Sequence, residues 1–338
     1  MAATFSATTA YTLAELRQFY NEDGKLSEMI KLLYQDNPIL QDIRWKSGNQ
    51  TDGHKGKILT SLPTTNFRRL YQGTAYSKAG IATVRETCRQ ISTRWGVDVD
   101  EIAMYEGTAE QNQFRLQEGM HHIESMQQFA VQQMLYGNPD SDPDEIRGLS
   151  AHYPYSNSPN VVNAGGSGTG CTSIWGIVWG EMDFCGIYPK NMPAGIRHED
   201  LGKFDAEDAS GNPYRAVGDE WKWDLGFFLA DWRSVVRIAN IKVANLSITD
   251  TSDASFIDLH KLTIEAKNKI KPGKRSRMRW YVPEQVMNGL EYQASNHSGN
   301  VHLHYGQWQD SKEVLMLHGK PVLECDGISE NETALSAG

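Results

Sequence analysis

The chain has 338 residues, 39% of them hydrophobic, and a formal net charge of -9 at pH 7. This length and apolar content are enough to bury a large core in two lobes or one elaborated domain. The acidic balance argues against a general nucleic-acid binder, because neutralising phosphates needs an excess of lysine and arginine.

Residues 1–50 have the pattern of an arm. Two short amphipathic runs, TLAELRQFY and KLSEMIKLLY, are interrupted at Asp23-Gly24. A stretch this short cannot form its own core, so its leucines and isoleucines need a surface of this chain or of a neighbour. The first residues show no secretory signal, and no apolar run in the chain is long enough to span a membrane. We therefore expect the protein to stay in the cytosol where it is made, without a membrane partner.

Residues 51–83 predict an extended two-stranded loop. The sequence GHKGKILTSLPTTNFRRLYQGTAYSK, which starts at Gly53, is rich in glycine, threonine, serine and basic residues. An isolated hairpin is marginal in water, so we expect this loop to be stabilised by something outside the domain that carries it. The run from Gly80 to Asp100 then alternates in part and predicts a strand that leads to the next helix.

A long helix is predicted over residues 108–137. Thr108 and Gln111 have the spacing of a capping box, and Gly137 followed by Pro139 ends the helix. At about 1.5 Å per residue it is roughly 40 Å long. Apolar residues recur every three or four positions and predict a core-facing stripe: Leu116, Met120, Ile123, Met126, Ala130 and Met134.

Three further patterns resemble functional sites but have simpler explanations. Asp140, Asp142 and Asp144 alternate as in a calcium loop, yet the required glycine and the final glutamate are missing, which favours a solvated loop. AGGSGTG at 164–170 lacks the lysine of a phosphate loop and is interpreted as a flexible turn between lobes. The four cysteines lie far apart and are expected to be reduced.

The second half predicts a β-rich lobe. TSIWGIVWGEMDFCGIYPKN contains two strand-like runs, interpreted as a hairpin that turns at Gly180-Glu181. Further strands are expected in AGIRHEDLG, WKWDLGFFLADW and SVVRIANIKVANL, and RWYV predicts a strand that runs into a helix near Pro283. Another helix is expected over residues 252–270.

The segment from Lys261 to Arg279 is the most basic in the chain, with a local net charge of +7. Three interpretations stay open: a surface for phosphate, a contact with an acidic patch of a neighbouring copy, or a solvated loop. His302 and His304 share one face of a predicted strand, but no third metal ligand stands nearby, which favours ordinary sheet histidines.

Two segments of the second half resemble the late part of tailed-bacteriophage major capsid proteins. They are WYVPEQVMNGL from Trp280 and LHGKPVLECD from Leu317. Closer likeness to the epsilon15 type covers nearly the whole chain, in TLAEL, NPIL followed by Trp45, LPT, FRRLYQG, LYGNPDSDP, TSIWGIVWG, HEDLG and DWRSVVRIANI. The resemblance implies an α+β, HK97-like fold with an N-terminal arm, an extended β-hairpin loop, a long spine helix, and peripheral and axial domains.

The resemblance also implies a division into domains. It gives the arm at 1–50, the hairpin loop at 51–83, a peripheral domain at 84–160 that contains the spine helix 108–137, and an axial domain at 161–338. Within the axial range, one strand near 231–245 belongs to the peripheral domain. Many relatives place this strand last, so its position here indicates a permuted strand order.

The function implied is that of a major capsid protein, which assembles through pentamers and hexamers into an icosahedral shell around double-stranded DNA. Its partners are then other copies of itself, a cement or decoration protein, portal and scaffold during assembly, and the enclosed DNA, bound nonspecifically. The location is the virion, and the host cytoplasm during assembly. Arg68, Arg69 and Tyr71 of the loop are the candidate subunit contacts.

No catalytic, cofactor or metal residue is assigned, and we expect the protein not to be an enzyme. Some members of the wider fold join a lysine to an asparagine of another subunit. Lys55, Lys57 and Lys78 lie in the corresponding loop, but no local pattern identifies their partners.

Two other functions are considered. A histidine-based hydrolase would use His302 and His304, or His121 and His122, and it needs a converging acid, base and nucleophile that no spacing in the chain indicates. A nucleic-acid-binding module would use the basic stretch 261–279 and would show DNA affinity that falls steeply with salt.

Overall fold

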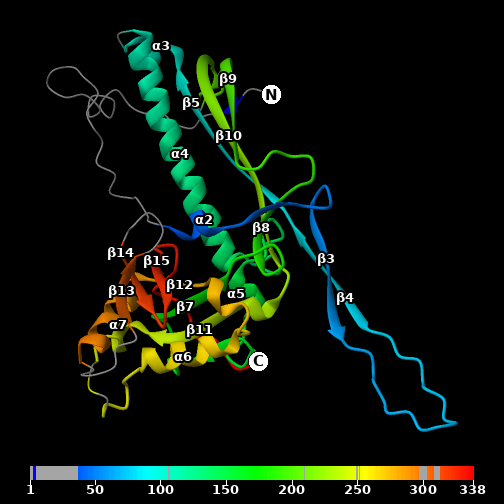
Figure 1. Cartoon of the computed structure of the whole chain (residues 1–338). Helices are drawn as coiled ribbons and strands as arrows, with labels where there is room; N and C mark the ends of the chain where they lie inside the picture. The colour runs from blue at the N-terminus through cyan, green and yellow to red at the C-terminus, as the bar shows by residue number, and fades with distance from the viewer. Residues whose placement is uncertain are drawn as a thin grey trace. The chain divides into compact units, whose positions relative to one another are not determined.

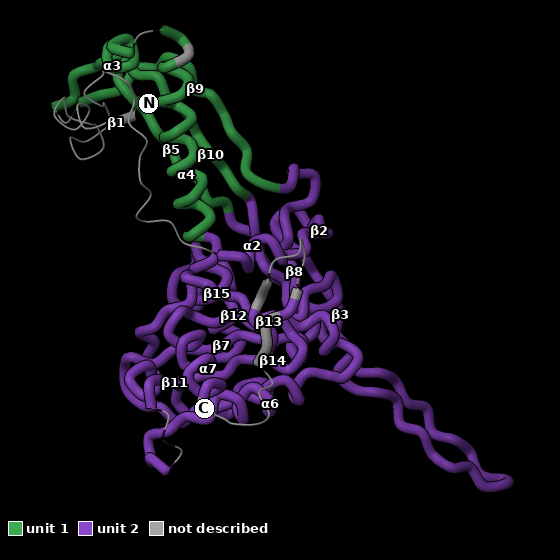
Figure 2. Tube along the Cα trace, turned by 60° about the vertical axis from the view of Figure 1, so that its left-hand side comes forward, with its two compact units in different colours: residues 1–34, 90–129, 195–223 green, residues 35–89, 130–194, 224–338 purple. Residues whose placement is uncertain are grey.

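The computed structural model describes residues 3–4, 37–105, 107–208, 210–248, 250, 252–296, 303–307 and 313–338, and has the mixed α and β elements of Figure 1. Most of the arm expected over 1–50 lies outside these residues. The chain divides into two compact units (Figure 2). Unit 1 comprises residues 1–34, 90–129 and 195–223, and unit 2 comprises residues 35–89, 130–194 and 224–338.

Unit 1 is built on two long antiparallel strands. β9 (Ile196–Glu207) pairs with β10 (Pro213–Leu229), and β10 also pairs with β5 (Arg89–Asp98). The short strand β1 (Ala3–Thr4) pairs with β9 in parallel. The register of β9 and β10 shifts after Gly218, where a Cβ would lie 2.3 Å from the carbonyl oxygen of Trp95. Glycine there lets β5 approach the bulge closely.

The helix expected over 108–137 is present as α4 (Thr108–Tyr136), and α3 (Val99–Ala103) precedes it. α4 ends directly before Gly137, as the sequence predicted, and the N–H of Gly137 donates to the carbonyl oxygen of Gln133 at 2.9 Å. A Cβ at Gly137 would lie 2.2 Å from the carbonyl oxygen of Ile146, so glycine there lets the following loop approach the helix end. Among the described helices, α4 included, none combines the length and the apolar content that crossing a membrane requires.

The apolar stripe predicted for this helix is correct only in part. Met126, Ala130 and Met134 are fully buried, but the side chains of Leu116 and Met120 are 68% and 49% exposed. The prediction was wrong in this first half because another residue occupies the buried face there.

That residue is Phe114, which is 1% exposed. Its ring lies 4.8 Å from the ring of Tyr105 and 5.9 Å from that of Trp95. A side chain two positions further along a helix points to nearly the opposite side, so Leu116 is turned away from this cluster.

Unit 2 contains a seven-stranded sheet, in the order β13-β14-β15-β12-β7-β11-β6. Its strands are β6 (Val161–Asn163), β7 (Cys171–Val178), β11 (Val235–Lys242), β12 (Met278–Val282), β13 (Leu303–Gln307), β14 (Glu313–Leu317) and β15 (Lys320–Glu324). All eight residues of β7 are buried. Helices α6 (Leu259–Lys269) and α7 (Glu284–Asn296) pack on the sheet through one apolar cluster that includes Ile174, Trp280, Leu259, Ala266, Val286 and Leu290.

The hairpin predicted around Gly180-Glu181 is wrong. β7 pairs with β11 and β12, whereas β8 (Phe184–Tyr188) pairs with the end of β10 and with β2 (Trp45–Ser47). The turn itself exists, since the N–H of Asp183 donates to the carbonyl oxygen of Gly180 at 3.0 Å. A fully buried strand needs partners on both edges, and for β7 these come from distant segments, so the chain passes from one sheet to another.

The glycine-rich loop 164–170 also differs from its interpretation. It joins β6 and β7 of the same sheet and so lies within unit 2. Gly165, Gly168 and Gly170 have positive φ angles, and the loop is held by the C-terminal segment: the N–H of Ala334 donates to the carbonyl oxygen of Gly168 at 2.8 Å. Neither end of this loop leaves the unit.

The remaining elements lie at the expected positions with different bounds, and β9 and β10 are longer than expected. The helix expected over 252–270 starts only at Leu259, because the Asp258 carboxylate accepts a hydrogen bond from the N–H of Lys261 at 2.8 Å and caps it. The short elements are α2 (Ile39–Asp42), α5 (Leu149–His152), η2 (Trp232–Ser234), η3 (Val243–Asn245) and η4 (Arg275–Arg277).

Candidate functional site

The extended loop predicted over 51–83 is a hairpin of unit 2. β3 (Gly53–Ser61) pairs antiparallel with β4 (Gly80–Thr87), from Gly53 opposite Thr87 to Ser61 opposite Gly80. Every residue from 59 to 78 is exposed. Figure 2 shows the hairpin running away from the rest of unit 2, so its outer half has no core of its own.

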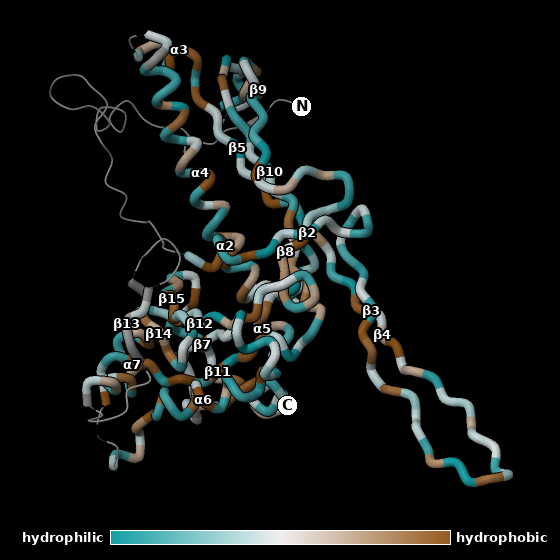
Figure 3. Tube along the Cα trace, viewed as in Figure 1, coloured by the Kyte–Doolittle hydropathy of each residue, from teal (hydrophilic) through white to brown (hydrophobic). Residues whose placement is uncertain are grey.

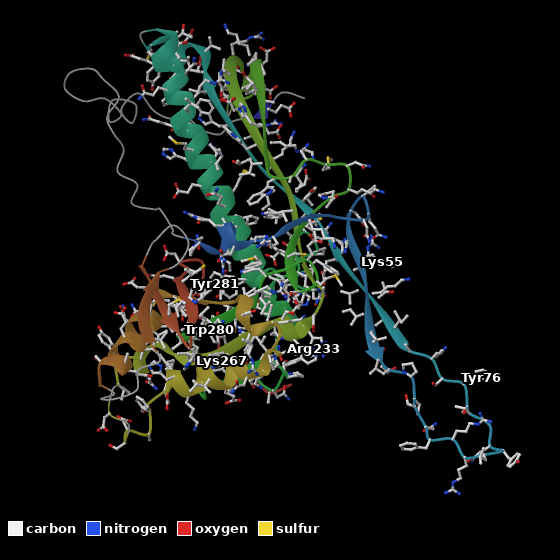
Figure 4. All side chains as sticks on the ribbon, viewed as in Figure 1. Lys55, Tyr76, Arg233, Lys267, Trp280 and Tyr281 are labelled. Atoms are coloured by element: carbon white, nitrogen blue, oxygen red, sulfur yellow. The ribbon has the colours of Figure 1, made fainter. Side chains whose placement is uncertain are left out.

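Large apolar side chains concentrate on this hairpin. Of the 17 that are exposed in the described part of the chain, seven belong to it: Leu59, Leu62, Phe67, Leu70, Tyr71, Tyr76 and Ile81. Brown segments mark several of them in Figure 3, and Figure 4 shows Tyr76 beyond the paired strands. An exposed apolar segment of this size is typical of a surface that binds a protein partner.

The hairpin is also uniformly basic. Residues 53–79 contain five lysines and arginines and no acidic residue. The structure brings the predicted contacts Arg68, Arg69 and Tyr71 together at the tip, where all three are exposed. The tip turns tightly: Tyr71 has a φ of 64°, and Arg68 Nε donates to the carbonyl oxygen of Gln72 at 2.8 Å. The tip thus presents cationic and aromatic groups side by side.

In contrast to the tip, the base of the hairpin is packed firmly into unit 2. The ring of His54 meets the ring of Phe228 edge-on at 4.6 Å, and a Cβ at Gly56 would lie 2.5 Å from the Phe228 ring. On the opposite strand, Glu86 is only 8% exposed, and its Oε1 lies 3.7 Å from Nε2 of His152. The base therefore anchors the hairpin, whereas residues 59–78 are all exposed among the residues that the structure describes.

Glu86 makes the stability of this anchor depend on pH. Burial raises the pKa of Glu86 to about 7, against the nearby charge of Arg147, and burial lowers the pKa of His152 to about 4. A carboxyl whose pKa is raised on folding destabilises the protein as pH rises from its unfolded pKa through its folded pKa. We expect Glu86→Gln to add roughly 1–3 kcal/mol to the free energy of unfolding at pH 8 and almost nothing at pH 4.5.

Urea unfolding at the two pH values measures this difference. The control is Glu181→Gln, because the Glu181 side chain is 69% exposed. An equal effect of Glu86→Gln at both pH values would contradict the assignment.

The histidines proposed for a hydrolase do not form a catalytic group. In unit 1, His122 Nδ1 lies 2.7 Å from Thr93 Oγ1, and its ring stacks on Trp221 at 5.2 Å, while His121 Nδ1 lies 3.9 Å from Glu118. His302 lies outside the described residues, and only the backbone of His304 is described. In the described ranges, no three histidine, cysteine or acidic side chains gather as metal ligands would.

Much of the basic stretch 261–279 is neutralised within the chain. Lys274 Nζ bonds the Asp231 carboxylate at 2.8 Å and pairs with Asp183, and Arg277 Nη2 lies 2.9 Å from Asp183. Burial acts to raise the pKa of Asp183, but the hydrogen bonds from Lys274 and Ser234 hold it below the usual value. Arg279 pairs with Asp42. Lys274, Arg277 and Arg279 therefore have carboxylate partners within the chain and do not belong to a freely solvated loop.

The acidic loop 138–145 is held by hydrogen bonds within the loop, by one ion pair, and by Arg89, whose Nη2 donates to the carbonyl oxygen of Pro143 at 2.6 Å. The Asp142 carboxylate accepts the N–H of Asp144 at 3.0 Å, and Arg147 lies 3.2 Å from Asp140. The four cysteines, Cys88, Cys171, Cys185 and Cys325, are free thiols.

The comparisons with known proteins agree with this architecture. The sequence model of the family described as major capsid protein GP7 matches residues 21–336. The structure resembles the capsid protein of bacteriophage Epsilon15, with a TM-score of 0.76, 24% identity, and coverage of 98% of this chain and 99% of that one. The capsid of bacteriophage JBD30 gives a TM-score of 0.53 at 9% identity, over 90% of this chain and 96% of that one. A search of curated proteins found no match.

These findings agree with the HK97-like α+β fold that the sequence predicted. The family match covers nearly all of the sequence, and the fold match extends over both units. The chain therefore belongs to the major capsid protein GP7 family and is a shell-forming major capsid protein with the HK97-like fold of phage capsids.

Proposed function

We propose that copies of this capsid protein assemble through pentamers and hexamers into an icosahedral shell around double-stranded DNA, and that the hairpin β3–β4 joins neighbouring copies. The role of the hairpin is inferred from the run of exposed residues from 59 to 78, which includes six large apolar side chains that are not buried against any described residue. Burying them on another copy removes this apolar surface from water. The role is structural, and we assign no catalytic residue.

Arg68, Arg69 and Tyr71 are the proposed anchors of this contact. Arginine and tyrosine are enriched among residues that dominate binding energy, because each combines a large contact area with directed polar groups. Each contact is small, but a closed shell repeats it many times, and the repeated contacts stabilise one another.

The other proposed partners follow from the capsid role. They are portal and scaffold proteins during assembly in the host cytoplasm, a cement or decoration protein on the shell, and DNA held nonspecifically. The net charge of -9 and the internal pairing of Lys274, Arg277 and Arg279 support weak contact with DNA, because these three cations already have carboxylate partners.

Electron microscopy of the chain co-expressed with its neighbouring phage genes tests the hairpin. We expect the triple variant Arg68→Ala, Arg69→Ala, Tyr71→Ala to lose shells and leave folded, smaller species, because the contact loses its anchors. The melting temperature should not change, since all three side chains are exposed.

The matched control is Lys55→Ala with Lys57→Ala, which removes two exposed cations from the paired part of the same hairpin. We expect it to form normal shells. Normal shells from the triple variant would sink the proposal for the tip.

A further inference from the structure

A polar pocket of unit 2 is not used by the hairpin. The cavity has a volume of about 420 Å³ and lies where α2 and the loop to β2 meet the start of β12. Three arginines line it, Arg44, Arg277 and Arg279, and Asp42 is its only carboxylate. Three guanidinium groups against one carboxylate give the pocket a positive charge.

The carboxylates near the pocket already have cationic partners within the chain. Asp42 pairs with Arg279 and accepts a hydrogen bond from the buried hydroxyl of Tyr281. Asp183, next to Arg277, also pairs with Lys274. Neither carboxylate is available to a further cation.

Arg44 has no such partner. Its side chain is exposed, and within the described part of the chain its guanidinium makes no ion pair or hydrogen bond. A guanidinium beside two others in a pocket matches the fork of a carboxylate, which accepts two parallel N–H bonds.

The chain itself carries a complementary segment. In the described ranges, residues 140–144 are the only five consecutive exposed residues with three carboxylates. Asp140 pairs with Arg147, but Asp142 and Asp144 form no ion pair with a described residue. Two of the three carboxylates in this turn are therefore available to a cation outside the chain.

We propose that the pocket around Arg44 binds a carboxylate of the acidic turn 140–144 of a second copy. This inference rests on the proposed assembly of copies into a shell. Each copy carries both the pocket and the turn, so the contact is head-to-tail and repeats around a ring of copies. DNA phosphate is a poorer match, because strong binding to DNA needs several uncommitted cations and the pocket offers one.

Charge reversal tests the contact. Arg44→Glu and Asp144→Arg each place like charges together, and we expect each to lower the yield of shells at least about tenfold at 0.1 M salt. The double variant Arg44→Glu, Asp144→Arg restores the opposite charges and is expected to form shells again. Both side chains are exposed without a described partner, so the melting temperature of each single variant should match the wild type. The control is Lys271→Glu, an exposed lysine outside the pocket, which should assemble normally.

Three results would overturn the inference. Normal shells from Arg44→Glu would show that the pocket is not a contact. Rescue of Asp144→Arg by Arg68→Glu with Arg69→Glu, and not by Arg44→Glu, would assign the acidic turn to the hairpin. Normal shells from Arg44→Glu that retain less DNA would assign the pocket to phosphate. None of these three outcomes contradicts the proposed role of the hairpin. That role is tested separately, by whether the triple variant Arg68→Ala, Arg69→Ala, Tyr71→Ala still forms shells.

Discussion

Replacing Glu332 with alanine is expected to lower the free energy of unfolding by about 3–5 kcal/mol. The Glu332 carboxylate meets Arg237 Nη2 at 2.9 Å, and the side chains are only 9% and 3% exposed. The hydroxyl of Tyr136 donates to the same carboxylate at 2.7 Å. Alanine leaves the arginine charge buried with no counter-ion, and this uncompensated burial is the source of the cost.

The remaining bonds of Arg237 cannot replace the carboxylate. Its Nε donates to Ser173 Oγ at 3.0 Å, its Nη1 donates to the carbonyl oxygen of Tyr153 at 3.3 Å, and its guanidinium lies 4.8 Å from the Trp175 ring. All of these partners are neutral. The positive charge therefore stays unbalanced in a buried site.

Urea denaturation followed by tryptophan fluorescence measures the effect. The control is Glu330→Gln, two residues earlier and exposed, which keeps a side-chain oxygen to accept the N–H of Gln285 and should cost no more than about 0.5 kcal/mol. Removing both charges with Arg237→Met and Glu332→Leu should recover most of the loss, because no charge then remains buried. A single variant as stable as the wild type would contradict this account of the pair.

Trp280→Ala is expected to cost a similar amount, about 3–5 kcal/mol, for a different reason. Trp280 is fully buried on β12, in the apolar cluster that joins the sheet of unit 2 to α6 and α7. Its Nε1 has no hydrogen-bond partner among the described residues, so the substitution removes apolar contacts and leaves a cavity without breaking a polar bond.

Trp232→Ala is the matched control. This tryptophan is 44% exposed, and the hydrogen bond that Tyr153 donates to it uses the backbone carbonyl oxygen, which alanine keeps. Thermal unfolding should place Trp232→Ala within about 1 kcal/mol of the wild type. Equal losses for the two tryptophans would contradict the assignment of the core.

The candidate contact site could be located from the sequence because its signal is local. A run with glycines, threonines and basic residues, and too few apolar residues for a core, predicted an extended loop, and the structure has a hairpin there whose residues 59–78 are all exposed. The contact pocket had no such signal. Arg44 and Arg279 lie more than two hundred positions apart in the sequence, and only folding brings them into one cavity.

By itself the sequence determined the elements whose causes act within a few residues. α4 begins at Thr108 and ends directly before Gly137, as the sequence predicted, and runs of β-branched and aromatic residues predicted β10 and β11. Tertiary structure alone decided that β7 and β8 join different sheets, that Phe114 and not Leu116 faces the core, and that Asp183 and Asp42 neutralise the basic stretch. Tyr281 and Asp42, for example, are bonded across 239 positions. The hydrophobic pattern of the sequence indicates which residues are buried, but which residues they contact depends on packing between distant segments.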